Sequence, residues 1–146
     1  MSAEADLRAA LAAALARVDP ERLIADGLRI DEAALWLDGP WGTRRVGLDG
    51  IRRIRLLAVG KAAAGMARAV ERRLGARLAD GLAVTKDGHA LPLDRVVCLE
   101  AAHPIPDARG VAAAARLAAF AQSCDAATLV LVLVSGGGSA LVPTAA

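Results

Sequence analysis

The 146-residue sequence predicts the α/β class, with a mostly parallel sheet between layers of helices. The main observation is a series of short apolar segments that alternate with segments of helical periodicity along residues 51–146. The last apolar segment, residues 128–134, is apolar at every position after Thr128, as expected for a strand covered on both faces. Hydrophobic residues make up 55% of the chain, which is enough for a substantial core and excludes intrinsic disorder. Together these observations predict an incomplete three-layer, doubly wound, Rossmann-like domain.

Residues 1–50 are predicted to form N-terminal helices and a short strand and turn segment ahead of this domain. Over residues 3–18, apolar residues recur at three- and four-residue steps, at Leu7, Leu11, Leu15 and Val18, which predicts an amphipathic helix. Asp19 and Pro20 fit the N-cap and the first turn of a second helix that ends just before Gly27. Between this helix and residue 50, short apolar pieces alternate with glycine-containing turns and therefore predict short strands.

Residues 51–146 are predicted to contain four strands and two helices. The strands are expected at residues 54–59, 81–85, 95–99 and 128–134, and the helices at about 62–74 and 108–121. Asp107 is the expected N-cap of the second helix. Strands that alternate with helices at this spacing are joined by crossover connections and therefore lie parallel.

Composition argues against several classes of partner. The 18 Lys and Arg residues nearly balance 16 Asp and Glu residues, and the formal net charge is +2, so nucleic acid is not an expected partner. The arginines between residues 44 and 55 are interpreted as a solvated or interdomain surface. Phe and Trp account for only 2% of residues and Tyr is absent, which leaves little for bases to stack on. The apolar run at residues 129–134 is far shorter than the roughly 20 residues that cross a bilayer.

The cysteines and the N-terminal segment indicate a reducing, cytoplasmic setting. Cys98 and Cys124 belong to no Cys-x-x-Cys pair, which argues against a zinc site and a disulfide scaffold. The first residues include acids where a signal peptide has a basic start.

Both lysines and both histidines of the chain follow predicted strands. Lys61 follows the first strand, Lys86 and His89 follow the second, and His103 follows the third. The carboxyl ends of parallel strands meet at one edge of a sheet, where ligands bind in open α/β folds. Since 16 of the 18 basic residues are arginines, a lysine at this edge is informative, because its ammonium is a compact point charge.

A glycine-rich segment follows the fourth predicted strand. It consists of Ser135, Gly136, Gly137, Gly138 and Ser139. Its backbone N–H groups and hydroxyls could bind an anion, and a helix is expected to begin beyond Ser139. The segment matches neither the dinucleotide fingerprint, nor the P-loop, nor the nucleophile elbow of α/β-hydrolases. A tight strand-to-helix turn without a ligand explains it equally well at this point.

The other candidate residues also have a functional and a structural interpretation. Lys61 could neutralise a phosphoryl oxygen, or it could be a surface lysine at the start of a helix. His103 could act as a hydrogen-bond donor or as an acid or base, or it could satisfy backbone groups in a proline-rich loop. Asp107 fits a helix cap better than a catalytic base, and Lys86, in an exposed turn, is the weaker of the two lysine candidates.

Four motifs carry a family resemblance. They are Val-Gly-Lys-Ala-Ala-Ala-Gly-Met-Ala at residues 59–67, Val-Thr-Lys-Asp-Gly-His at 84–89, Glu-Ala-Ala-His-Pro-Ile-Pro-Asp at 100–107 and Ser-Gly-Gly-Gly-Ser-Ala-Leu at 135–141. In this order and spacing they resemble the N-terminal domain of the type II glycerate 2-kinases, some of which carry the older label hydroxypyruvate reductase. The resemblance extends from the first helix onward, and four motifs in register are far more specific than any one of them.

The resemblance implies a Mg²⁺-dependent transfer of the γ-phosphoryl group of ATP to the 2-hydroxyl of D-glycerate, giving 2-phosphoglycerate. It implies that Lys61 is the catalytic lysine and that residues 135–139 form the loop that binds substrate or phosphate. It also implies that His103 binds substrate or phosphate together with that loop, because His103 lies in what resembles the family's His-Pro-x-Pro-Asp segment. Phosphoryl transfer depends on positioning and charge neutralisation, which such groups supply. The Mg²⁺ ligands are not identified, and a homo-oligomer is left open.

The sequence also departs from the family. Ala58 and Ala102 stand where the family commonly has glycine, which affects turn geometry more than chemistry. Family members are several times longer, so the chain is expected to be the N-terminal part of such a kinase, to bind ligand weakly and not to turn over by itself. Two alternatives remain: a nicotinamide-dependent hydroxypyruvate reductase, which the missing fingerprint disfavours, and a non-catalytic anion- or nucleotide-binding module.

Overall fold

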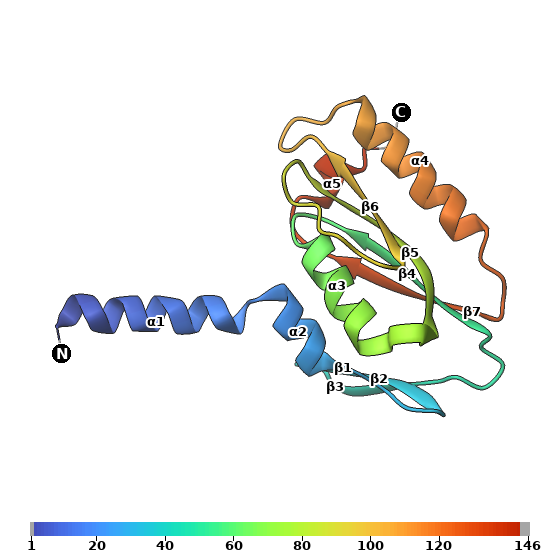
Figure 1. Cartoon of the computed structure of the whole chain (residues 1–146), viewed down its shortest axis with the longest axis horizontal. Helices are drawn as coiled ribbons and strands as arrows, with labels where there is room; N and C mark the ends of the chain where they lie inside the picture. Colours follow the sequence, from blue (N-terminus) through green and yellow to red (C-terminus); the bar gives the residue numbers. More distant parts are fainter. Residues whose placement is uncertain (1, 144–146) are drawn as a thin grey trace.

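The computed structural model of the chain describes residues 2–143 and confirms the α/β class (Figure 1). A four-stranded parallel sheet has the order β6-β5-β4-β7, and a three-stranded antiparallel sheet has the order β1-β2-β3. The helices are α1 (Ala3–Arg17), α2 (Pro20–Gly27), α3 (Ala63–Leu74), α4 (Ala108–Gln122) and α5 (Gly138–Leu141). The strands are β1 (Leu28–Ile30), β2 (Ala34–Gly39), β3 (Gly42–Gly47), β4 (Arg53–Val59), β5 (Leu78–Lys86), β6 (Val96–Ala101) and β7 (Thr128–Val134). None of the helices in the described part of the chain is long and apolar enough to cross a membrane.

Helix α1 extends away from the rest of the molecule (Figure 1). Ser2 caps it by accepting a hydrogen bond from the Ala5 N–H at 3.3 Å. The predicted helix forms, but none of its residues is buried, and its leucines, at positions 7, 11 and 15, are all exposed. Its apolar stripe therefore contributes nothing to the core of the described residues.

Helix α2 begins where Asp19 and Pro20 predict. The Asp19 carboxylate accepts the Arg22 N–H at 2.8 Å, and Pro20 occupies the first turn. Glu21 then binds α3, accepting from Arg68 Nε and from Arg72 Nη1, each at 3.1 Å. The small sheet β1-β2-β3 that follows packs its Leu28 and Leu35 side chains into the same core as α3.

The parallel sheet starts in its middle and grows in both directions. β4 is the first strand, β5 and β6 are added on one side, and β7 is added on the other side of β4. The strand order therefore reverses between β4 and β7. In open α/β sheets the crevice at such a switch point, at the carboxyl ends of the strands, is where ligands bind.

Helices α3 and α4 lie on opposite faces of the parallel sheet, which gives the predicted three layers. Alternate side chains of β4 point to opposite faces. Leu56 and Ala58 pack with α3, whereas Val59 packs in a second cluster that includes Ala113 of α4 and Leu141 of α5.

Strand β7 differs from the prediction, because it is not covered on both faces. Within the described residues it pairs with β4 alone and forms one edge of the sheet. Its residues 129, 131 and 133 pack against the core on the α3 side. On the other face, Val132 is 62% exposed and Val134 is 70% exposed, because α4 lies over β5 and β6 rather than over β7.

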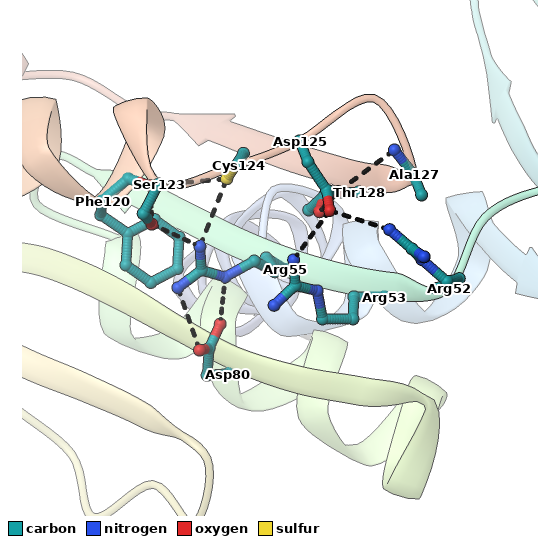
Figure 2. A network of polar contacts seen from close by, with 10 residues as sticks. All are labelled: Arg52, Arg53, Arg55, Asp80, Phe120, Ser123, Cys124, Asp125, Ala127 and Thr128. Atoms are coloured by element: carbon teal, nitrogen blue, oxygen red, sulfur yellow. Dashed lines mark hydrogen bonds and ion pairs between the residues drawn. The ribbon is translucent and has the colours of Figure 1, made fainter.

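The arginines between residues 44 and 55 do not form one solvated surface as predicted. Arg55 points to the α4 side of the sheet and is only 9% exposed (Figure 2). Its guanidinium binds both Asp80 carboxylate oxygens, at 2.6 and 3.0 Å, and lies 3.7 Å from the Phe120 ring centroid. Arg52 and Arg53, in contrast, are exposed and share the Asp125 carboxylate at 3.1 and 3.2 Å.

Candidate active site

The turn after β4 and the glycine-rich loop after β7 are joined at the switch point by four hydrogen bonds. The Ser135 N–H donates to the Val59 carbonyl at 2.9 Å, and the Lys61 N–H donates to the Gly136 carbonyl at 3.0 Å. The Ser135 hydroxyl accepts the Ala62 N–H at 3.0 Å and donates to the Val59 carbonyl at 3.5 Å. Because its hydroxyl is used in this way, Ser135 holds the two loops together rather than presenting a free donor to a ligand.

Lys61 and His103 meet at Gly137, on the glycine-rich loop. Gly137 has φ +90°, a left-handed conformation that favours glycine. A Cβ atom at this position would lie 2.8 Å from His103 Nε2 and 3.3 Å from Lys61 Cγ. The structure thus brings together the lysine that follows β4, the histidine that follows β6 and the loop that follows β7.

The polar groups of this cluster have no partners within residues 2–143. The exposed Lys61 ammonium forms no ion pair or hydrogen bond there, and neither does the half-buried His103 imidazole. The Gly136 and Gly137 N–H groups likewise have no acceptor in this part of the chain. A cation, an imidazole and two backbone donors are therefore available to an anion at the carboxyl edge.

Helix α5 begins inside the glycine-rich loop, not beyond it as predicted. Gly138 and Ser139 form its first residues, and Gly137 precedes it in the left-handed conformation. The prediction placed the start too late because glycine has low helix propensity, whereas here the left-handed Gly137 completes the turn and leaves Gly138 free to be helical. Ser139 is exposed, and no described residue contacts its hydroxyl by a hydrogen bond.

The exposed turn that the sequence predicts is formed by Asp87 and Gly88 and is followed by the exposed His89, whereas Lys86 is the half-buried last residue of β5. Gly88 has φ +73°, and the His89 N–H donates to the Lys86 carbonyl at 3.1 Å. The His89 and Ala90 N–H groups also donate to Glu100 Oε1, at 3.0 and 2.9 Å. No hydrogen bond within the described residues joins Lys86 or His89 to Lys61 or His103, so these two residues are separate from the cluster at Gly137.

Asp107 caps helix α4, as its sequence position predicts. Its carboxylate accepts the Arg109 N–H at 3.0 Å and the Gly110 N–H at 3.3 Å. The hydrogen bond from the Arg109 guanidinium lowers the pKa of Asp107 below its ordinary value, with a smaller contribution from the Gly110 N–H. A carboxylate with a lowered pKa is a weak base, which favours the structural role.

Arg109 is the residue of this edge that the sequence analysis missed. Besides Asp107 it binds both Asp87 oxygens, at 2.6 and 2.9 Å, and this pairing lowers the pKa of Asp87. Asp87 is 22 positions away in the chain, so no local pattern indicates the pairing.

The described residues contain no group of three or more His, Cys, Asp or Glu side chains that could hold a metal ion. The carboxylates of Asp87 and Asp107 at this edge are already bound by Arg109. Residues 2–143 therefore do not form a metal cage made of protein side chains alone.

The fold and the site define a class of protein: a Rossmann-like α/β domain that presents a lysine, a histidine and a glycine-rich loop at its topological switch point. Residues 6–146 match the family model described as Domain of unknown function (DUF4147), and the chain belongs to this family.

Several relatives have names that agree with the four motifs. The Glycerate 2-kinase of Pyrococcus horikoshii is 34% identical over 128 residues, which cover 88% of this chain and 27% of that protein. The D-glycerate 2-kinase of Thermotoga maritima is 41% identical over 90 residues, covering 61% and 22%. An Agrobacterium vitis protein with a provisional hydroxypyruvate reductase name is 41% identical over 87 residues, covering 60% and 20%. The predicted resemblance to the glycerate 2-kinases is confirmed.

Two crystal structures share the fold. One is a Pyrococcus horikoshii protein, with a TM-score of 0.75 and 34% identity over 84% of this chain and 26% of that chain. The other is the glycerate kinase of Thermotoga maritima, with a TM-score of 0.65 and 32% identity over 85% and 26%. The chain therefore spans about a quarter of the length of the relatives it matches.

Proposed function

We propose that this chain forms the phosphoryl-binding part of a D-glycerate 2-kinase, which transfers the γ-phosphoryl group of ATP to the 2-hydroxyl of D-glycerate. The observation that carries the proposal is the meeting of Lys61, His103 and Gly137 at the switch point of the sheet. The names of the relatives supply the substrate and the reaction.

Lys61 is the proposed catalytic residue. Phosphoryl transfer requires charge neutralisation on oxygens that are already negative, and an ammonium with no carboxylate neighbour in residues 2–143 can supply it. The Gly136 and Gly137 N–H groups add neutral donors close to this lysine, since a Cβ atom at either glycine would lie within 4 Å of the Lys61 side chain. His103, through Nε2, would bind a substrate or phosphate oxygen next to them.

Gly60 and Ser135 keep these groups in place. Gly60 has φ +121°, and its Cα lies so close to Ser135 that a side chain there would overlap the serine hydroxyl and carbonyl. Because β4 and β7 pair along their whole length, the two loops start from a fixed separation. Such positioning accounts for a large part of catalysis in reactions where the protein forms no covalent bond to the substrate.

ATP and Mg²⁺ are part of this proposal. Mg²⁺ commonly binds nucleotide phosphates and keeps several waters, and it neutralises phosphoryl charge when bound. Since the described residues contain no cluster of three or more metal-ligating side chains, the proposed mechanism assigns the ion no residue of this chain. A cytoplasmic location belongs to the same proposal. So does the expectation that the chain alone binds ligand weakly and does not turn over.

A binding experiment on the 146-residue chain tests the role of Lys61. Titration of the chain with Mg·ATP, followed by NMR, should give weak binding that Lys61→Ala weakens by about tenfold or more. Arg52→Ala is the matched control, because Arg52 is an exposed cation far from the proposed site. It precedes β4 and its partner Asp125 precedes β7, so the pair lies at the amino ends of the strands. Equal affinity in wild type and Lys61→Ala would remove Lys61 from the proposed site.

A turnover assay tests the rest of the proposal. ADP release is measured with D-glycerate and Mg·ATP, and only background turnover is expected from the 146 residues. Robust turnover would show that the chain needs no further part.

A hydroxypyruvate reductase is the second candidate, because an Agrobacterium vitis relative carries that provisional name. It is disfavoured because the segment from Gly136 lacks the dinucleotide fingerprint. NADH binding to the chain, together with NADH consumption in the presence of hydroxypyruvate, would favour the reductase over the kinase.

A further inference from the structure

The first turn of α4 contacts the segments that follow three of the four parallel strands at the carboxyl edge. Arg109 binds Asp87, which follows β5, and Asp107, which ends the loop after β6. Gly110, the next residue, packs against the segment that follows the glycine-rich loop: a Cβ atom there would lie 2.9 Å from the Leu141 carbonyl oxygen. A single helical turn therefore connects the loops that follow β5, β6 and β7.

The Arg109 guanidinium separates two carboxylates. It binds the two oxygens of Asp87 at 2.6 and 2.9 Å through its terminal nitrogens, and it binds Asp107 through Nε at 2.7 Å. The planar fork of arginine allows this arrangement, which the point charge of a lysine cannot reproduce. Without the guanidinium the two carboxylates would repel each other, since Asp107 is close enough to raise the pKa of Asp87.

The loop that carries His103 depends on its two ends. Within the described residues, no backbone hydrogen bond outside helices and strands involves residues 103–106. At one end the loop leaves β6, where the Ala101 carbonyl accepts the Asp87 N–H at 3.3 Å. At the other end it reaches Asp107, whose carboxylate accepts from the Arg109 guanidinium and from the N–H groups of Arg109 and Gly110. Both ends are therefore tied to Asp87, one directly and one through Arg109.

We propose that Arg109 is a positioning residue, which holds Asp87 and Asp107 together and so keeps His103 beside Gly137 and Lys61. That the placement of His103 matters for phosphoryl binding rests on the proposed function. That Arg109 determines the placement of His103 does not rest on it. Arg109 acts through His103 and is not placed in contact with the reacting atoms.

NMR of the histidine side chains provides a direct readout. The chain has two histidines, so its imidazole spectrum reports His89 and His103 alone. In Arg109→Ala we expect the His103 side-chain signals to shift and broaden, and exchange of the Asp87 amide, which donates to the Ala101 carbonyl, to become about tenfold faster. Arg109→Lys should restore the wild-type spectrum only in part, because it keeps the charge but loses the fork.

Two further variants make the test decisive. Asp87→Asn leaves the Asp107 cap and its ion pair intact, so it stays informative if Arg109→Ala does not fold, and it should move the His103 signals in the same direction. Arg52→Ala removes an exposed ion pair at the amino ends of the strands and should leave the His103 signals unchanged. A wild-type His103 spectrum in folded Arg109→Ala or Asp87→Asn would overturn the proposal.

A titration with Mg·ATP separates this inference from the proposed function. If both hold, Arg109→Ala weakens binding by about threefold to tenfold, and Arg52→Ala does not. If His103 moves in the variants while wild type shows no ATP binding, the positioning role stands and the kinase proposal fails. If ATP binds equally to wild type and Arg109→Ala and His103 stays in place, the kinase proposal stands and the positioning role is overturned.

Discussion

At the scale of single residues, Gly60 sets how closely the Lys61 turn approaches the glycine-rich loop. Its φ of +121° lies outside the range that other residues adopt without strain. Its Cα also lies against Ser135, so that a Cβ atom would be 2.7 Å from the serine carbonyl carbon and closer still to two oxygens. The position thus excludes a side chain for two independent reasons.

Gly60→Ala should therefore lower the free energy of unfolding by about 2–4 kcal/mol, since strain and overlap add. Gly42→Ala is the matched control, because Gly42 has φ +87° but no atom within 4 Å of a Cβ, and should cost about 1 kcal/mol. Urea unfolding midpoints measure both. Equal losses would show that backbone strain alone, and not the contact with Ser135, sets the cost.

The site residues differ in how far the sequence predicts them. Lys61 and His103 follow strands, and parallel strands bring their carboxyl ends together, so their shared edge is predictable from position alone. The structural role of the Ser135 hydroxyl cannot be predicted in this way, because it depends on the register between β4 and β7. The role of Arg109 depends on Asp87, which only the tertiary fold brings near.

At the scale of elements, Arg55 links three parts of the domain. Figure 2 shows its guanidinium between Asp80 of β5 and the end of α4. It donates to the Ser123 hydroxyl at 2.7 Å and to Cys124 Sγ at 3.4 Å, in addition to the two bonds to Asp80. The Asp80 hydrogen bonds raise the Arg55 pKa further above its ordinary range, so the side chain stays charged at every working pH.

Arg55→Ala should destabilise the chain by about 2–4 kcal/mol, because it removes several charge-assisted hydrogen bonds and the packing on Phe120. Asp80 is half-exposed and water can solvate it after the change, which keeps the loss below that of a fully buried pair. Arg53→Ala is the control, since its exposed pair with Asp125 should contribute less than about 1 kcal/mol. Thermal unfolding of the two variants compares them, and similar shifts would contradict a special role for Arg55.

Substitutions in helix α1, in contrast to Arg55→Ala, should hardly change the stability of the chain. A 15-residue helix with no buried residue is marginally stable by itself and adds little to the rest of the molecule. Leu11→Asp in α1 should change the free energy of unfolding, measured with urea, by less than about 0.5 kcal/mol. Ile24→Asp in α2 should lower it by about 2 kcal/mol or more, because Ile24 packs against the core. A large loss from Leu11→Asp would show that the stripe of α1 is covered in solution.

The ends of elements were predicted well where a side chain or a proline marks them. Asp19 and Asp107 cap α2 and α4 as expected, because a cap is a local interaction. The surroundings of β7 were predicted wrongly, since an apolar run shows that side chains avoid water but not which element covers them. The pairing of Arg55 was also missed, because Asp80 and Phe120 approach it only through the sheet and the α4 crossover.

At the scale of the whole molecule, β7 leaves an apolar edge at the point where the sheet could continue. Val132 and Val134 are exposed on one face, and within the described residues the outer backbone groups of β7 have no partner strand. An edge of this kind favours pairing with another chain, because neither charges nor a bulge protect it. A complete, self-sufficient binding module would not be expected to leave it open.

The 146-residue chain should therefore self-associate as its concentration rises, which analytical ultracentrifugation over about 5–200 μM can measure. Val132→Lys with Val134→Lys places two charges on the exposed face of the edge strand and should return the chain to a monomer. Ile105→Lys is the matched control, because Ile105 is exposed and apolar but lies in a loop, so this change should leave association intact. A wild-type chain that stays monomeric throughout and melts cooperatively would instead favour the self-sufficient anion-binding module over the kinase part, since such a domain needs no partner at β7.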